Sequence, residues 1–286
     1  LTAKKLDETL RDMHRNHKFA QLVFYLEADQ GGSMFEGILK NNINVYAVTA
    51  AAGGESTDAT YCDLHETMQL PCLGDEFSVN WMEDSDMVDT TIETLKEQFE
   101  TVQELTEGSR VCHFGNLSMV REPVSWFQGV GNTILRTSKA NGLTTTKGTV
   151  KNRHRRVSWP SRDVELMHLQ KLKQLGYRSA TVDAEISRIH EDRRNVENVF
   201  TELINSLVSD AAERRSLLEE KSSIKNLDCH DDVVQMFILI CVNVNKYDHA
   251  LKYMYVLNNF CNKFDDSGKI IGAMRMICPG TRNRFI

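Results

Sequence analysis

Two uninterrupted apolar runs constrain the fold of this chain more than any other feature: Leu22–Ala28 and Ile43–Ala51. Each is bounded by turn residues, and neither shows the apolar–polar alternation of a half-exposed antiparallel strand. Parallel strands buried on both faces have such uninterrupted runs. The sequence therefore predicts an α/β sheet, preceded by a helix at Thr2–His17 and extended by a third strand at Val111–Phe114.

The segment between the second and third predicted strands contains a loop and a helix. Ala52–Asp75 is rich in Gly, Thr and Asp and predicts a loop. We expect the stretch that begins SVNWMEDSD to open with a short strand and to continue as a helix from about Val88 to Leu105, with Asp86 or Asp89 as its N-cap.

The second half of the chain is helical. Residues 137–162 have no apolar periodicity and are rich in Thr, Gly, Asn and Arg, which is typical of a linker. The length of 286 residues agrees with two domains, so we expect one at 1–136, the linker at 137–162 and a second domain at 163–286. Apolar residues at helical spacing predict core-packing helices at Val164–Leu175, Ala184–Val208, Val233–Val242 and Tyr247–Cys261.

Charge is unevenly distributed along the chain. Residues 51–107 contain fifteen acidic residues and one lysine, whereas residues 147–156 contain five basic residues and no acid. The acidic run is either a solvated face or a surface that attracts the basic run. Nucleic-acid binding is disfavoured because the basic run is short and Trp159 is its sole nearby aromatic. No window is apolar enough for a membrane span.

The seven cysteines do not form the CxxC pairs of a zinc site, so we expect no metal. Cys62 and Cys72 could close part of the Ala52–Asp75 loop into a ring. The four C-terminal cysteines are either buried free thiols or two disulfides in a small helical domain; they are Cys229, Cys241, Cys261 and Cys278. Asn116-Leu117-Ser118 is a glycosylation sequon, which agrees with a secretory compartment.

Asp29 lies where the first apolar run breaks into a glycine pair, within LVFYLEADQGGSMFEG. A buried strand that ends in a tight turn commonly presents a reactive side chain, because the strand end is rigid and the turn exposes it. The side chain presented here is a carboxylate, followed by Gln30. An aspartate therefore occupies a position where a nucleophile would be expected.

The chain resembles the legumain (asparaginyl endopeptidase) family in the segments YLEADQGGSMFEGIL, NINVYAVTAA, GES, CLGDEFSVNWMEDSD and HFGN and in its C-terminal cysteine spacing. The resemblance implies a cysteine endopeptidase that cleaves after asparagine in lysosomes, vacuoles or guts and needs no cofactor. It also implies a caspase-like α/β sheet, of which this chain supplies the later half, followed by an all-α, death-domain-like prodomain.

The sequence departs from the family pattern at the nucleophile. The family has a cysteine where Asp29 stands, and the following ESGS is QGGS here. The His-Gly segment of the general base should precede Leu1, and no signal peptide is present in this chain, so we expect an N-terminally truncated copy. No histidine in the expected first domain lies in a sequence context that matches the family's catalytic histidine; these histidines are His14, His17, His65 and His113. We therefore expect this copy to be catalytically inactive.

Half of the family's asparagine pocket is present. The resemblance assigns substrate binding to Glu27, to Ser56 and Thr57 within GEST, and to Asp75 within CLGD. These acids and hydroxyls can accept from an amide NH₂ group and donate to its carbonyl through a partner. The alternative is that Glu27 and Asp75 only satisfy buried backbone donors.

The family pattern also implies disulfides and processing sites. It pairs Cys62 with Cys72, Cys229 with Cys261 and Cys241 with Cys278. In the family the helical tail caps the active site and is released in acid by cleavage in the linker, where Asn141 and Asn152 are candidate sites.

Three functions follow from the resemblance. The first is a legumain-like peptidase by descent, inactive in this copy, which still binds peptide or protein segments containing asparagine. The second is a non-catalytic partner or decoy that regulates an active legumain. The third is an active peptidase with an unexpected role for Asp29. The expected location is secretory or endolysosomal.

Overall fold

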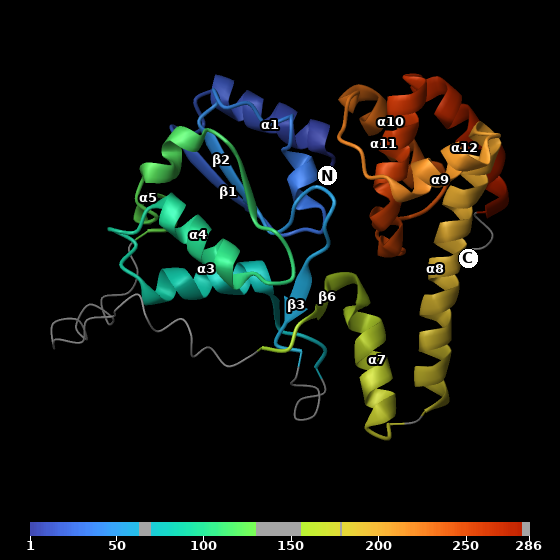
Figure 1. Ribbon diagram of the computed structural model, residues 1–286, viewed down its shortest axis with the longest axis horizontal. Helices are drawn as coiled ribbons and strands as arrows, with labels where there is room; N and C mark the ends of the chain where they lie inside the picture. The colour runs from blue at the N-terminus through green and yellow to red at the C-terminus, as the bar shows by residue number, and fades with distance from the viewer. Residues whose placement is uncertain (63–69, 130–155, 178, 282–286) are drawn as a thin grey trace. The chain divides into compact units, whose positions relative to one another are not determined.

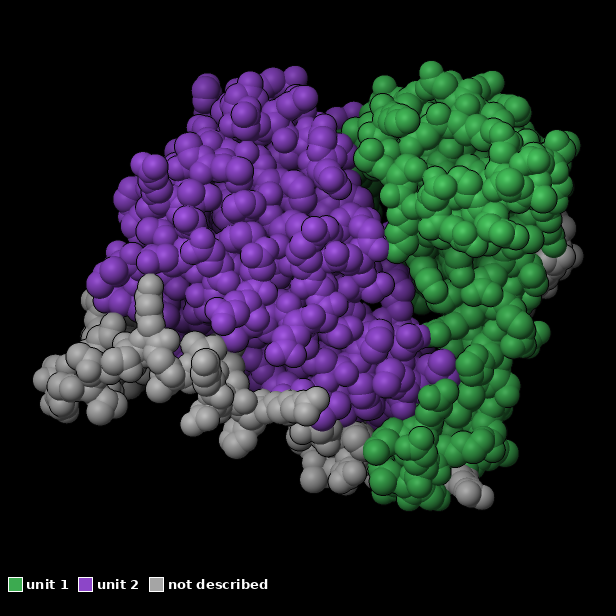
Figure 2. Space-filling view, in the orientation of Figure 1, with its two compact units in different colours: residues 1–5, 169–286 green, residues 6–168 purple. Residues whose placement is uncertain are grey.

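The computed structural model describes residues 1–62, 70–129, 156–177 and 179–281. The chain forms two compact units, which are coloured separately in Figure 2. Residues 6–168 form one, called here the sheet unit; residues 1–5 and 169–286 form the other, called the helical unit. Residues 156–162, which the sequence places in the linker, thus belong to the sheet unit.

The predicted parallel strands form the centre of the sheet unit (Figure 1). β1 (Leu22–Leu26) pairs in parallel with β2 (Val45–Thr49), and β2 pairs antiparallel with β5 (Cys112–Gly115), so β2 lies in the middle. Every residue of β2 is buried. The uninterrupted apolar runs are therefore explained by a central strand that is covered on both faces.

Helices cover both faces of this sheet. Successive residues of β2 point to opposite faces of the sheet. On one face, Val45 packs with Leu10 of α1 (Ala3–Arg15). On the other face, Tyr46 packs in a separate cluster with residues of two other helices. Those helices are α3 (Glu76–Met87) and α4 (Leu95–Leu105), which lie across the sheet from α1 in Figure 1. The predicted α/β organisation is confirmed.

Two expectations for residues 78–105 are wrong. Residues 78–81 are helical, because Asp75 caps α3 by accepting from the Ser78 N–H at 2.6 Å. The second helix begins at Leu95, where Thr94 and Glu97 form a capping box. Asp89 instead accepts from Thr91 in the turn between the two helices.

A second, smaller sheet takes two strands from the region expected to be a loop and one from the expected linker. β3 (Asp58–Thr60) pairs antiparallel with β4 (Gly74–Asp75) and with β6 (Trp159–Pro160). A disulfide joins Cys62 to Cys72 beside β3, and the Trp159 side chain packs against Cys62. The remaining short elements of the sheet unit are η1 (Gly31–Met34), η2 (Leu117–Arg121), α5 (Ser125–Gln128) and η4 (Ser161–Asp163).

The rest of the described chain is helical, as expected. α7 (Val164–Gln174) spans the boundary of the two units. The other elements are α8 (Ala180–Leu207), α9 (Ala211–Glu219), α10 (Leu227–Ile240), η5 (Asp248–Tyr253), α11 (Met254–Phe264) and α12 (Ser267–Thr281). The helix expected at 247–261 is thus a 3-10 turn followed by an α-helix.

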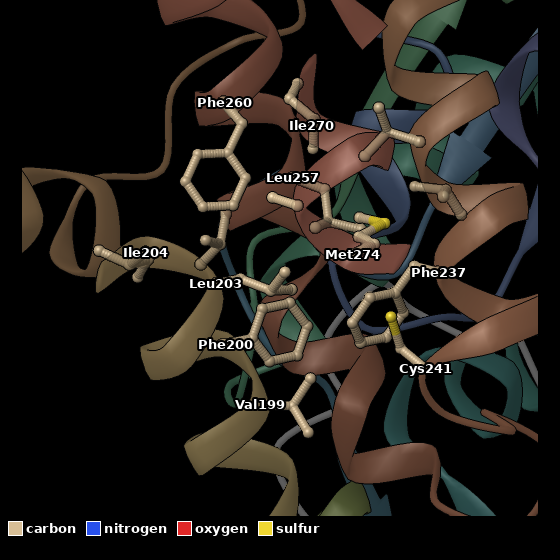
Figure 3. Close-up of a cluster of buried hydrophobic side chains, with 14 of the residues drawn as sticks. Val199, Phe200, Leu203, Ile204, Phe237, Cys241, Leu257, Phe260, Ile270 and Met274 are labelled. Carbon is tan, nitrogen blue, oxygen red and sulfur yellow. The ribbon is translucent and has the colours of Figure 1, made fainter. Parts of the chain in front are cut away.

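The helical unit is organised around the apolar stripe of α8. Phe200 and Leu203 are fully buried, and Figure 3 shows them facing Phe237, Leu257 and Met274 from three other helices. Two disulfides tie these helices together: Cys229–Cys261 and Cys241–Cys278. All three disulfides join the pairs that the resemblance implies.

Candidate functional site

The candidate site begins at the turn after β1. Gln30 has a left-handed backbone (φ 59°), and its N–H donates to the Glu55 carbonyl at 2.7 Å. The Gly32 N–H donates to the Ala51 carbonyl at 2.9 Å, and a Cβ on Gly32 would lie 2.8 Å from the Gly53 nitrogen. Only glycine fits such a close backbone approach. The turn after β1 is thereby held against the loop after β2.

Asp29 lies at this turn, and its side chain is buried, with 4% of it exposed. Its Oδ1 accepts from the Thr57 N–H at 2.6 Å and from the Thr57 hydroxyl at 3.1 Å. Its Oδ2 forms an ion pair with Nε of Arg162. Both carboxylate oxygens are thus bound within the sheet unit.

Arg162 belongs to a segment, residues 156–163, that we call the strap. Along it, Arg156 Nη2 contacts Asn80 Oδ1 at 2.9 Å and Glu83 Oε2 at 3.4 Å. Ser158 Oγ donates to Glu76 Oε1 at 2.6 Å. The strap is therefore bound to acidic and amide side chains of the sheet unit.

The far end of the strap reaches Asp29 through Thr57. β6 pairs with β3 at Ala59↔Trp159, and the Ser161 N–H then donates to the Thr57 carbonyl at 3.0 Å. The hydroxyls of Ser161 and Thr57 lie 3.1 Å apart. Backbone pairing thus places the next residue, Arg162, on the Asp29 carboxylate.

Glu27 and Asp75, the two predicted pocket acids, interact with each other. Burial, followed by the charge of Asp75, raises the pKa of Glu27 to about 8, against an opposing hydrogen bond with Thr57. Glu27 Oε2 has no hydrogen-bond partner among the described residues. Asp75 also satisfies a backbone donor as the α3 N-cap, as the alternative interpretation expected. The structure therefore brings Glu27, Asp29, Thr57 and Asp75 together.

Other predicted residues lie elsewhere. Ser56 is exposed. His113 lies on β5, where its ring stacks on Phe99 and its Nδ1 is 3.1 Å from the Tyr46 hydroxyl; burial lowers its pKa. His14 lies on α1 and packs against Phe19. Asn141, Asn152 and His65 are outside the described residues.

Ser161 and Arg162 are site residues that were not predicted from the sequence. We assigned both to the linker, although Trp159-Pro160 after a basic run was a signal that this stretch packs against something. The pairing of β6 with β3 joins residues far apart along the chain, and no local pattern encodes it.

The described residues place limits on other chemistry. No group of three or more His, Cys, Asp or Glu side chains within them could hold a metal ion. Within the same residues, no helix combines the length and apolar character needed to cross a bilayer.

Comparisons with known proteins identify two matching family models. The Peptidase C13 family matches residues 1–130, and the legumain prodomain matches residues 184–278. The first match contains Glu27, Asp29, Thr57 and Asp75, and the second contains the four cysteines of the helical unit.

Individual relatives align with nearly the whole chain. Legumain of Rattus norvegicus is 34% identical over 283 residues, which cover 97% of this chain and 62% of that protein. Legumain of Homo sapiens is 33% identical over 289 residues (98% and 63%). The vacuolar-processing enzyme delta-isozyme of Arabidopsis thaliana is 31% identical over 295 residues (96% and 61%). The chain thus spans about three fifths of the length of these relatives.

Proposed function

The chain belongs to the peptidase C13 (legumain) family, and we propose that it descends from an active cysteine peptidase of this family. Its own site, in this proposal, binds peptide but does not hydrolyse it. The proposal rests on the position, burial and hydrogen-bond partners of Asp29. This carboxylate stands at the family's nucleophile position, is buried, and has both oxygens engaged by Thr57 and Arg162.

A carboxylate cannot replace the thiolate in this reaction. A cysteine thiolate attacks an amide carbonyl because it is intrinsically a strong nucleophile and forms a thioester that water can open. A carboxylate would form an anhydride, which the departing amine attacks faster than water does. Its charge would also repel the oxyanion that must develop beside it. Backbone donors that stabilise such an oxyanion contribute about 2.7–4 kcal/mol each in other enzymes.

The acids beside Asp29 support retention of binding. Glu27 and Asp75 interact within one cluster, and Thr57 joins that cluster to Asp29. A Glu27 carboxyl that holds its proton near neutral pH can donate to an amide carbonyl, while the Asp75 carboxylate can accept from the amide NH₂. We therefore propose segments containing asparagine as ligands. An active family member regulated by this chain is the alternative partner.

The disulfides and the relatives support a secretory location. Three disulfides are consistent with an oxidising, secretory-pathway environment. One relative carries the name vacuolar-processing enzyme. We propose a secretory or endolysosomal location, where acidity and processing within the region of Asn141 and Asn152 would act on the chain.

The test is a peptidase assay on the longest transcript that contains this sequence, made with Asp29 and with Asp29→Cys. The substrate is a fluorogenic peptide with asparagine at the cleaved position, at pH ~5.5, where carboxylates and histidines are partly protonated. The expected result is turnover by the Asp29→Cys form alone. Turnover by the natural form, abolished by Asp29→Asn, would overturn the proposal.

A further inference from the structure

We propose that Asp29 has converted the nucleophile position into a guanidinium-binding site, and that the chain's own Arg162 occupies it. The inference rests on the proposed function, because both assign Asp29 a non-nucleophilic role. It goes further by naming the chemical group that the site binds and the segment that supplies it.

The Asp29 carboxylate is matched by its donors. Thr57 supplies two donors to Oδ1, and the Arg162 Nε–H satisfies Oδ2. The Asp29 side chain is 4% exposed and the Arg162 side chain 20%, so water replaces neither partner readily. A buried carboxylate without its cationic partner is strongly unfavourable. The site therefore requires a cation at Oδ2.

The charge around Asp29 also favours a bound cation. The charge of Asp29 acts on both Glu27 and Asp58; Asp75 also acts on Glu27, and Glu76 on Asp58. Arg162 brings a positive charge to this acidic group by pairing with Asp29. Guanidinium suits the position better than ammonium because its charge is delocalised, it is weakly hydrated, and its donors lie in a fixed plane.

Main-chain pairing of the strap holds Arg162 in place. The strap adds β6 to the edge of β3, with Cys62 N–H donating to the Val157 carbonyl and Ser161 N–H to the Thr57 carbonyl, each at 3.0 Å. Trp159 is buried beside the Cys62–Cys72 disulfide. Main-chain pairing supplies affinity and a side-chain pocket supplies specificity in this mode of peptide recognition. The ligand is therefore an arginine at the end of an added strand.

A peptide supplied in trans tests the site directly. The protein carries Trp159→Ala and Arg162→Ala, which remove the buried anchor and the arginine of its own strap and so weaken the strap's hold on the β3 edge. The labelled peptide has the sequence of residues 157–166, VSWPSRDVEL. Three versions carry arginine, lysine or citrulline at the sixth position; citrulline keeps the shape of arginine without its charge. We expect the arginine peptide to bind at least tenfold more tightly than the citrulline peptide, with lysine between them. Adding Asp29→Asn to the protein should abolish that difference.

Equal binding of the arginine and citrulline peptides, or a preference that survives Asp29→Asn, would overturn the inference. Neither readout depends on peptide hydrolysis, so turnover in the peptidase assay would overturn the proposed function and leave this test intact.

Hydrogen exchange on the intact chain provides a second test, in which the strap stays in place and no peptide is added. Asp29→Asn and Arg162→Gln should each lower the protection factors of the Cys62 and Ser161 amides at least tenfold. The double variant should lower them no further, because the two side chains act as one pair. Arg110→Gln, which removes an exposed ion pair with Glu55, is the matched control and should leave these amides unchanged. Additive effects of the two single variants would contradict the pairing.

Discussion

Thr57 donates both its backbone N–H and its hydroxyl to one oxygen of Asp29, at 2.6 and 3.1 Å. The same hydroxyl lies 3.1 Å from Ser161 Oγ. A single threonine thus connects the end of β1, the start of β3 and the strap. This arrangement explains why a fully buried position carries a hydroxyl instead of the isosteric valine.

Thr57→Val removes the hydroxyl and retains the backbone N–H. Hydrogen bonds to charged groups contribute about 1.5–3 kcal/mol, so we expect the free energy of unfolding of the sheet unit to fall by roughly that amount. Tryptophan fluorescence in denaturant measures this unit specifically, because Trp81, Trp126 and Trp159 all lie in it. Thr91→Val is the control, since it removes an exposed threonine–aspartate bond. Equal losses in both variants would contradict the role of Thr57.

Glu27 makes the sheet unit less stable at high pH. Its pKa is raised to about 8, first by burial, so between pH 4.5 and 8 the folded protein holds a proton that the unfolded chain has lost. The contribution of Glu27 to the free energy of unfolding is therefore fully present below pH 4.5 and is lost as the pH rises through 8. Glu27→Gln removes this titration, and we expect the variant to be more stable than the natural chain at pH 8 by about 1–3 kcal/mol.

The check on Glu27 is denaturant unfolding followed by tryptophan fluorescence at pH 5, 6.5 and 8. The Glu27→Gln profile should be flatter across this range than that of the natural chain. Glu100→Gln, at an exposed position on α4, should leave the profile unchanged. An unaltered slope in Glu27→Gln would contradict the assignment.

His249 makes the helical unit less stable in acid. Burial lowers its pKa, the charges of Arg193 and Lys252 lower it further, and Glu197 opposes them. The Nε2 atom lies 3.7 Å from Glu197 Oε1, and the side chain is 14% exposed. The unfolded chain therefore binds a proton at a higher pH than the folded unit, so stability is complete above pH 6.5 and falls as the pH drops through the lowered pKa.

His249→Gln should reduce the loss of stability between pH 7 and 5 by about 1 kcal/mol. Burial also lowers the pKa of His230, so part of the acid sensitivity should remain. Hydrogen exchange of amides in α8 and η5 at both pH values provides the measurement. His190→Gln, at an exposed position on α8, is the matched control, and a change there as large as that in His249→Gln would refute the assignment.

Asn116 is predicted to carry an N-linked glycan when the chain passes through a secretory pathway. Its side-chain oxygen accepts from the Ser118 N–H at 3.1 Å and from the Ser118 hydroxyl at 2.7 Å, and Leu117 and Ser118 are exposed. We expect a glycosidase-sensitive mobility shift that Ser118→Ala abolishes and Ser118→Thr retains. A shift that persists in Ser118→Ala would place the glycan elsewhere.

Elements that depend on a local residue pattern could be predicted from the sequence. The runs at Leu22–Ala28 and Ile43–Ala51 predicted parallel strands, because an uninterrupted apolar run fits a strand covered on both faces. The apolar stripe of α8 predicted the core of the helical unit, because residues at helical spacing share one face of the helix. The break after Ala28 also identified Asp29 as the residue at the strand end.

Capping decided the helices that the sequence misassigned. Several acids between Asp75 and Asp89 are suitable N-caps by type, and the cap that forms depends on which backbone donors lie within reach. Asp75 captures the Ser78 N–H, so residues 78–81 become helical. Thr94 and Glu97 satisfy the start of α4 between them, and Asp89 stays in the turn.

The buried strands, the helical second half and the aspartate at the nucleophile position could all be predicted from the sequence. The contacts of Asp29 could not, because they arise from packing between distant segments. Apolar periodicity acts between neighbours in the chain, whereas the pairing of β6 with β3 depends on an unfilled strand edge and a complementary charge far away in sequence. Arg162 reaches Asp29 because that distant pairing brings it there, and no local pattern in either segment records the partner.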